Sequence, residues 1–145
     1  MEIEWFKALA AEPKIAEVPA LSSEDIATLD RIADNFDVNE AQKVKDFEAT
    51  TNHDVKAVEY YLKQAVADSP ALAEHREFFH FACTSEDINN LAYGLMLKKA
   101  RSEVLIPELD QLITKLSTLA DNWCSIALLS RTHGQPASPS TIGKE

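Results

Sequence analysis

Three short polar stretches stand out in this 145-residue chain because their side chains can bind anions and move protons. Imidazole groups can both give and take a proton near neutral pH, and hydroxyl groups can hydrogen-bond a carboxylate. Proton transfer on an anionic substrate needs this combination of groups. The stretches are Thr50-Thr51-Asn52-His53-Asp54, Cys83-Thr84-Ser85-Glu86-Asp87 and Ser130-Arg131-Thr132-His133-Gly134-Gln135.

Two of these stretches carry the pattern of a helix N-terminus. Thr51-x-x-Asp54 and Thr84-x-x-Asp87 each resemble a capping box, in which a hydroxyl and a carboxylate satisfy free backbone N–H groups. The same N–H groups and the helix dipole attract carboxylates and phosphates. Both stretches therefore keep two interpretations, as caps alone or as caps that also bind an anion. His133 is either a surface-loop histidine or a proton donor.

The charge balance argues against two classes of partner. The chain has 24 acidic and 14 basic residues, a net charge of −10 and a pI near 4.8. General nucleic-acid binders and anionic-membrane binders carry basic surfaces instead. No apolar run reaches the roughly 18 residues of a membrane span, and the start lacks the pattern of a signal peptide. We therefore expect a cytoplasmic protein with no nucleic-acid or membrane partner.

The sequence predicts neither a metal site nor a cofactor. Cys83 and Cys124 are the only cysteines and form no C-x-x-C pair, so we expect reduced thiols. His75 and His80 do not share one helix face at their spacing, and we interpret both as structural. His80-x-x-Cys83 supplies two ligands, whereas a zinc site needs at least three. The glycine-rich motifs of dinucleotide, nucleotide-phosphate and serine-hydrolase sites do not occur.

Helix-breaking residues are scarce, which favours an all-α fold. Only 3 of the 145 residues are glycine, and the chain between Pro19 and Pro70 contains neither glycine nor proline. Apolar spacing predicts a helix at the start, one that Ser22-x-x-Asp25 caps, and further helices over 39–49 and 54–66. The longest predicted helix covers 85–121 and is kinked by Pro107.

The predicted helix over 85–121 is too long for one small domain. At 1.5 Å per residue it spans about 55 Å, whereas a compact chain of this size is about 38 Å across. Its apolar side chains need cover from another copy or from further chain. Residues 126–129 are predicted to be extended, and Ser138-Pro139 is predicted to start a helix that has fewer than two turns left. The long helix therefore predicts either a helical-bundle oligomer or a fragment of a longer chain, and the interrupted helix at the end favours the fragment.

Three longer segments carry a resemblance to a known family. They are Thr50 to Leu62, His80 to Ala92 and Leu128 to Glu145. They resemble the bacterial adenylosuccinate lyases of the aspartase/fumarase superfamily. The sequence from Arg131 to Ala137 favours these lyases over other members of the superfamily. The resemblance implies an all-helical homotetramer with active sites built from three subunits. It also implies β-elimination of fumarate from adenylosuccinate, which gives AMP, and from SAICAR in purine biosynthesis, without a metal or organic cofactor.

Carried over position by position, the resemblance assigns roles to residues of all three stretches. His133 would be the general acid that protonates the departing nitrogen. His53 would help to bind the substrate and support this acid. The hydroxyls at positions 84 and 85 would hold the dicarboxylate part of the substrate. The substrate-binding residues besides His53 would be Asn52, Asp54, Thr84, Ser85 and Thr132.

Two parts of such an enzyme are missing from this sequence, namely an Arg-Tyr phosphate contact and a Gly-Ser-Ser-x-Met-Pro-His-Lys loop whose serine would be the base. We therefore expect an N-terminal fragment that is inactive alone. Residues 1–73 would form an N-terminal helical domain without its first segment, and residues 74–145 the truncated beginning of the central bundle. Two alternatives stay open: another fumarate-releasing lyase of the superfamily, or a non-catalytic helical oligomerisation module.

Overall fold

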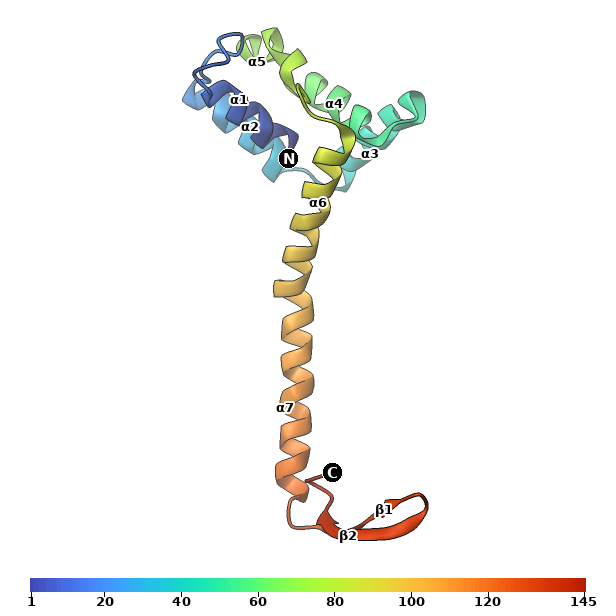
Figure 1. Cartoon of the computed structure of the whole chain (residues 1–145). Coiled ribbons are helices and arrows are strands. Elements are labelled where there is room, and N and C mark those ends of the chain that lie inside the picture. The colour runs from blue at the N-terminus through green and yellow to red at the C-terminus, as the bar shows by residue number, and fades with distance from the viewer. The chain divides into compact units, whose positions relative to one another are not determined.

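The computed structural model describes residues 1–145, whose helices and strands are labelled in Figure 1. The chain divides into two compact units, residues 1–94 and 95–145. The elements are α1 (Glu2–Ala11), α2 (Ser23–Asp34), α3 (Val38–Thr51), α4 (Asp54–Ala65), α5 (Pro70–Glu74), a 3₁₀ turn (Arg76–Phe78), α6 (Ser85–Ala100), a π turn (Arg101–Leu105), α7 (Ile106–Trp123), β1 (Ala127–Thr132) and β2 (Gln135–Thr141). The all-α prediction is confirmed, with one small hairpin added.

Helix caps explain where the helices of the first unit begin. The predicted capping box at α2 is confirmed, because the Asp25 N–H donates to Ser22 Oγ at 3.1 Å and the Ser22 N–H donates to Asp25 Oδ2 at 3.2 Å. The predicted cap at Thr51 is wrong. Helix α3 continues through Thr51, Asn52 ends it in the left-handed region at φ 51°, and His53 is the N-cap of α4. A left-handed C-cap suits asparagine better than most residues.

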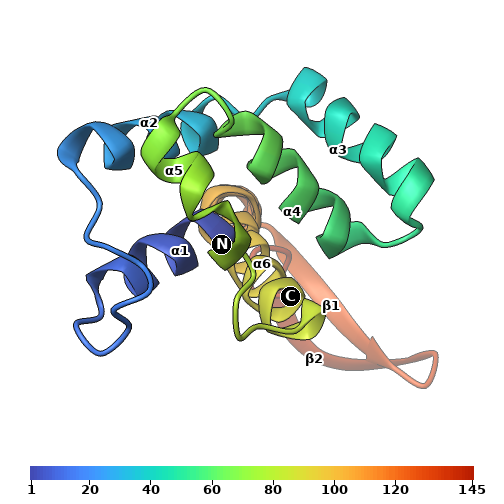
Figure 2. The same ribbon diagram turned by 90° about the horizontal axis from the view of Figure 1, so that it is seen from above.

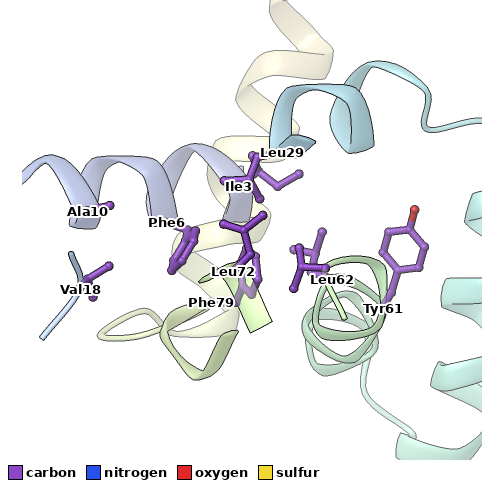
Figure 3. Close-up of a cluster of buried hydrophobic side chains, with 10 residues drawn as sticks. Ile3, Phe6, Ala10, Val18, Leu29, Tyr61, Leu62, Leu72 and Phe79 are labelled. Carbon is purple, nitrogen blue, oxygen red and sulfur yellow. The ribbon is translucent and has the colours of Figure 1, made fainter. Parts of the chain in front are cut away.

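The first unit is held by an apolar core between α1, α2, α4 and the segment around α5 (Figure 3). Phe6, Leu29 and Leu72 are completely buried, and each contributes about 1.5–3 kcal/mol by leaving water. Helices α3 and α4 lie side by side in Figure 2, joined through residues 52 and 53. The core residues are Ile3, Phe6, Ala10, Val18, Leu29, Tyr61, Leu62, Val66, Leu72 and Phe79.

The helical residues run without a break from Ser85 to Trp123, so the predicted long helix is confirmed and ends slightly later than expected. The π turn ends at Leu105, two residues before Pro107, whose ring nitrogen cannot donate a helical hydrogen bond. An apolar stripe on α7 is left uncovered by this chain, with exposed fractions of 53–60%. The stripe consists of Leu109, Leu112, Ile113 and Leu116.

The hairpin of the second unit corrects one prediction. Strands β1 and β2 pair antiparallel, with Leu129 opposite Pro139. The extended segment predicted at 126–129 is confirmed for residues 127–129, which lie in β1. The predicted helix at Ser138-Pro139 is wrong because these residues belong to β2. A residue before proline is itself biased toward extended backbone, and β1 supplies the pairing that a short helix lacks.

The two compact units meet between residues 94 and 95. The predicted domain boundary between residues 73 and 74 concerns the division of the chain in an assembled enzyme, so it stays a prediction. None of the helices combines the length and the apolar character that crossing a membrane requires.

Candidate active site

His53 takes up a structural role at the start of α4 that also fixes its ring. Its Nδ1 accepts the Lys56 backbone N–H at 3.2 Å, as a cap acceptor does. In the neutral ring the proton must then be on Nε2. Asp54 Oδ1 lies 3.4 Å from the same Nδ1, but it already accepts the Val55 N–H at 2.8 Å. We therefore assign the Nε2–H tautomer to neutral His53 on the basis of its cap hydrogen bond.

The structure brings the first two polar stretches together in the first unit. His53 Nε2 lies 3.3 Å from Ser85 Oγ, and the assigned tautomer makes the imidazole the donor. The Asn89 amide lies 3.4 Å from Asp54 Oδ2, which makes a second contact between the start of α4 and the first turns of α6. Ser85 is half-buried, whereas His53 is half-exposed. The imidazole and the hydroxyl therefore share one exposed edge of the unit.

Backbone N–H groups at both helix starts stabilise the ionised carboxylates. The Val55 N–H, and then the Asn89 amide, hold the pKa of Asp54 below its usual range. The Thr84 N–H at 2.8 Å, and then its hydroxyl at 2.9 Å, lower the pKa of Asp87 in the same way. The carboxylate half of the predicted capping box is therefore present, whereas the Thr84 hydroxyl donates to Asp87 rather than accepting a backbone N–H.

The third stretch forms the tip of the hairpin in the second unit. His133 and Gly134 are the two central residues of the turn, with φ angles of 53° and 74°. Two consecutive left-handed residues are the geometry of a type I′ turn, which glycine adopts at no steric cost. Thr132 Oγ1 lies 2.9 Å from His133 Nδ1, and Nε2 makes no hydrogen bond within the chain. The exposed Nε2 is therefore free to meet a ligand.

Seven candidate site residues are predicted from the sequence, and the structure of the single chain brings three of them together. His53, Asp54 and Ser85 gather at the adjoining starts of α4 and α6, with Thr84 next to Ser85 in the chain. Asn52 serves as the C-cap of α3. Thr132 and His133 belong to the second unit. A common pocket for all three stretches stays a prediction.

One polar pair in the first unit was missed from the sequence. The carboxylate of Glu2 is buried and lies 2.7 Å from His80 Nδ1. Burial, and then the charges of Glu2 and Asp87, raise the pKa of the Cys83 thiol, which makes this thiol a weak nucleophile. No local pattern signals the pair, because 78 positions separate Glu2 from His80.

Comparison with known proteins decides the family. The family described as Lyase matches residues 1–145. The chain belongs to this lyase family. It is 57% identical to an adenylosuccinate lyase of Vibrio cholerae, 56% to one of Escherichia coli and 53% to one of Haemophilus influenzae, each over 145 residues. In each case all of this chain is matched to 32% of the relative, so the chain spans about a third of the length of these proteins.

These matches confirm the resemblance drawn from the three polar segments and their surroundings. The lyase chain is similar to adenylosuccinate lyases along its whole length, which includes the helix starts at α4 and α6 and the hairpin tip. The all-α architecture agrees with this membership.

A cavity of the first unit is unsuited to an anionic substrate. It encloses about 540 Å³ between α1, α2, α3, α4 and the start of α6. Its wall is mainly apolar and contains no lysine, arginine or histidine side chain, whereas four carboxylate side chains line it. Carboxylates there would repel a carboxylate or phosphate. These side chains are Glu2, Glu4, Glu48 and Asp54.

No group of three or more histidine, cysteine or acidic side chains is arranged to hold a metal ion. The cluster of His53, Asp54 and Ser85 offers an imidazole, a carboxylate, a hydroxyl and the N–H groups at a helix start. Such a set can bind a carboxylate and support a proton transfer.

Proposed function

We propose that a full-length lyase containing this chain cleaves adenylosuccinate into AMP and fumarate, and cleaves SAICAR in the parallel step of purine biosynthesis. The observation that carries the proposal is the contact of His53 with Ser85, across 32 positions, in a chain 57% identical to a Vibrio cholerae adenylosuccinate lyase. Both residues lie in segments on which the family resemblance rests.

The proposed reaction is a β-elimination. A base takes a proton from the carbon next to a carboxylate, the C–H electrons form the double bond of fumarate, and the C–N bond breaks. The departing nitrogen keeps the electron pair of that bond and needs a proton. His133 supplies it in our proposal, and its exposed Nε2 has no partner within the chain that would compete. The base comes from a residue outside these 145 positions.

The proposed substrate contacts lie around this proton donor. Thr84 and Ser85 hold the dicarboxylate part, aided by the N–H groups at the start of α6. His53 helps to bind the substrate and supports the acid, with its Nε2–H directed toward Ser85. Asn52, Asp54 and Thr132 complete the set of proposed contacts. The proposal includes no metal or organic cofactor.

We further propose a homotetramer in the cytoplasm, with no nucleic-acid or membrane partner. The support for an oligomer is the uncovered apolar stripe Leu109, Leu112, Ile113 and Leu116, because contiguous exposed apolar surface marks association sites. In the proposed assembly this stripe packs in a helical bundle. The bundling of sister subunits would bring His133 to the site at His53 and Ser85.

The test is made with the full-length enzyme, the substrate adenylosuccinate, and the products AMP and fumarate as readouts. His133→Ala should lower kcat by about 10²- to 10⁴-fold, which is the usual contribution of a proton-transfer group. His75→Ala is the matched control, because His75 lies in none of the three polar stretches. A near-normal kcat for His133→Ala would remove His133 from the acid role. The isolated 145-residue chain should show no turnover.

A further inference from the structure

Glu2 is an acidic side chain buried on the inner face of α1 with only one hydrogen-bond partner. It is 3% exposed, and its Oε1 lies 2.7 Å from His80 Nδ1. The other oxygen, Oε2, is buried and makes no hydrogen bond. A buried polar oxygen without a hydrogen bond costs free energy, so a role in fixing one conformation is a reason for its presence.

Two further contacts join the same face of α1 to the same part of the chain. The Trp5 indole N–H donates to the Phe81 carbonyl at 2.7 Å. The rings of Phe6 and Phe79 pack with their centroids 4.6 Å apart. Figure 3 shows both side chains in the same apolar cluster. Glu2, Trp5 and Phe6 share one helix face, because they are three and four positions apart. Helix α1 thus contacts residues 79, 80 and 81 in succession.

The segment Phe79–Cys83, here called the connecting segment, has an unfavourable backbone. His80 and Ala82 have φ angles of 65° and 59°, in the left-handed region that side-chain-bearing residues avoid. Such conformations persist where the surroundings fix them. Thr84 follows directly, and Ser85 begins α6 and reaches His53 at 3.3 Å. The path of the connecting segment therefore sets where both hydroxyls lie.

We propose that Glu2 is a positioning residue for the substrate-binding hydroxyls. It holds His80, and through His80 the connecting segment, so that Thr84 and Ser85 lie beside His53. This inference rests on the proposed function for its kinetic consequence, but its geometric part stands on the contacts alone. A displacement of about 1 Å at a binding group can cost on the order of 100-fold in activity.

The kinetic test uses Glu2→Gln in the full-length enzyme with adenylosuccinate as substrate. The variant keeps the shape of the side chain and removes its charge. We expect kcat/KM to fall about 10- to 100-fold, mostly through a higher KM, because the displaced hydroxyls bind the substrate. His80→Gln should show the same loss, and the double variant should lose no more than either single one, because both act on one segment.

Glu59→Gln is the matched control, since Glu59 is also a buried glutamate, 5% exposed, but pairs with Lys56 and Lys63 along α4. It should leave KM unchanged. If Glu2→Gln does not fold, Trp5→Phe carries the test, because it removes only the donor to the Phe81 carbonyl and should also raise KM. A folded Glu2→Gln enzyme with the wild-type KM would overturn the proposal.

A crystal structure of the Glu2→Gln enzyme separates this proposal from the proposed function. The distance from Ser85 Oγ to His53 Nε2 should lengthen beyond hydrogen-bond range relative to the wild-type enzyme. An unchanged distance would overturn the positioning role even in an active enzyme. An inactive wild-type enzyme whose Glu2→Gln variant shows the lengthened distance would refute the proposed function and retain the geometric role of Glu2.

Discussion

The two roles of His53 can be separated by a pair of substitutions. His53→Asn keeps a side-chain acceptor at the N-cap of α4 and removes the imidazole Nε2. His53→Ala removes both. Asparagine is among the best N-cap residues, and the change from a capping residue to alanine costs about 1 kcal/mol. The cap hydrogen bond is the 3.2 Å contact with the Lys56 N–H. We therefore expect His53→Ala to be less stable than His53→Asn by about 1 kcal/mol.

The loss of the imidazole, rather than the loss of the N-cap hydrogen bond, should lower kcat/KM. Loss of a hydrogen bond to a charged group costs about 1.5–3 kcal/mol, which corresponds to about 10- to 150-fold in kcat/KM. Both variants of the full-length enzyme should show this loss for adenylosuccinate, whereas thermal unfolding should distinguish them. Retention of wild-type kcat/KM by His53→Asn would refute a substrate role and leave His53 as a cap alone.

Two further predictions concern stability and assembly. In Asp87→Asn the free energy of unfolding should fall less steeply with pH below about pH 4. The pKa of Asp87 in the folded chain lies below its unfolded value of about 3.9. The contribution of Asp87 to stability is therefore present above the unfolded pKa and is lost as the pH falls through the folded pKa. Acid titration followed by circular dichroism checks this, with Glu86→Gln as the control; equal slopes for Asp87→Asn and the wild type would contradict it. Leu112→Lys should reduce the oligomer size of the full-length enzyme in sedimentation, because it charges the apolar stripe on α7. Gln111→Lys, on the opposite side of the helix, should not, and a tetramer retained by Leu112→Lys would remove the stripe from the interface.

Local signals were sufficient for most helices but not for every cap. Ser22-x-x-Asp25 was predictable because both partners of the box lie within one turn. The same reasoning failed at Thr51-x-x-Asp54, because the N-cap of α4 is His53, two residues after Thr51, and Asn52 is the C-cap of α3. Histidine is not among the preferred N-cap residues, so the capping pattern did not predict His53 as the N-cap of α4.

Contacts between distant residues were beyond reach of the sequence alone. Pro139 has the local signal of a first helical position, but pairing with Leu129 places it in a strand. The contact of His53 with Ser85 and the pair of Glu2 with His80 join residues 32 and 78 positions apart, so no local pattern predicts them. The family resemblance, by contrast, was recognisable because short motifs keep their order and spacing.

The most direct test of the central claim is a crystal structure of the full-length enzyme with adenylosuccinate bound to a slow His133→Asn variant. We predict that, with all subunits present, the side chain at 133 lies within hydrogen-bond distance of the departing nitrogen, and that Thr84 and Ser85 contact the dicarboxylate next to His53. A substrate bound elsewhere, or position 133 remote from every His53 and Ser85 of the assembly, would contradict the account.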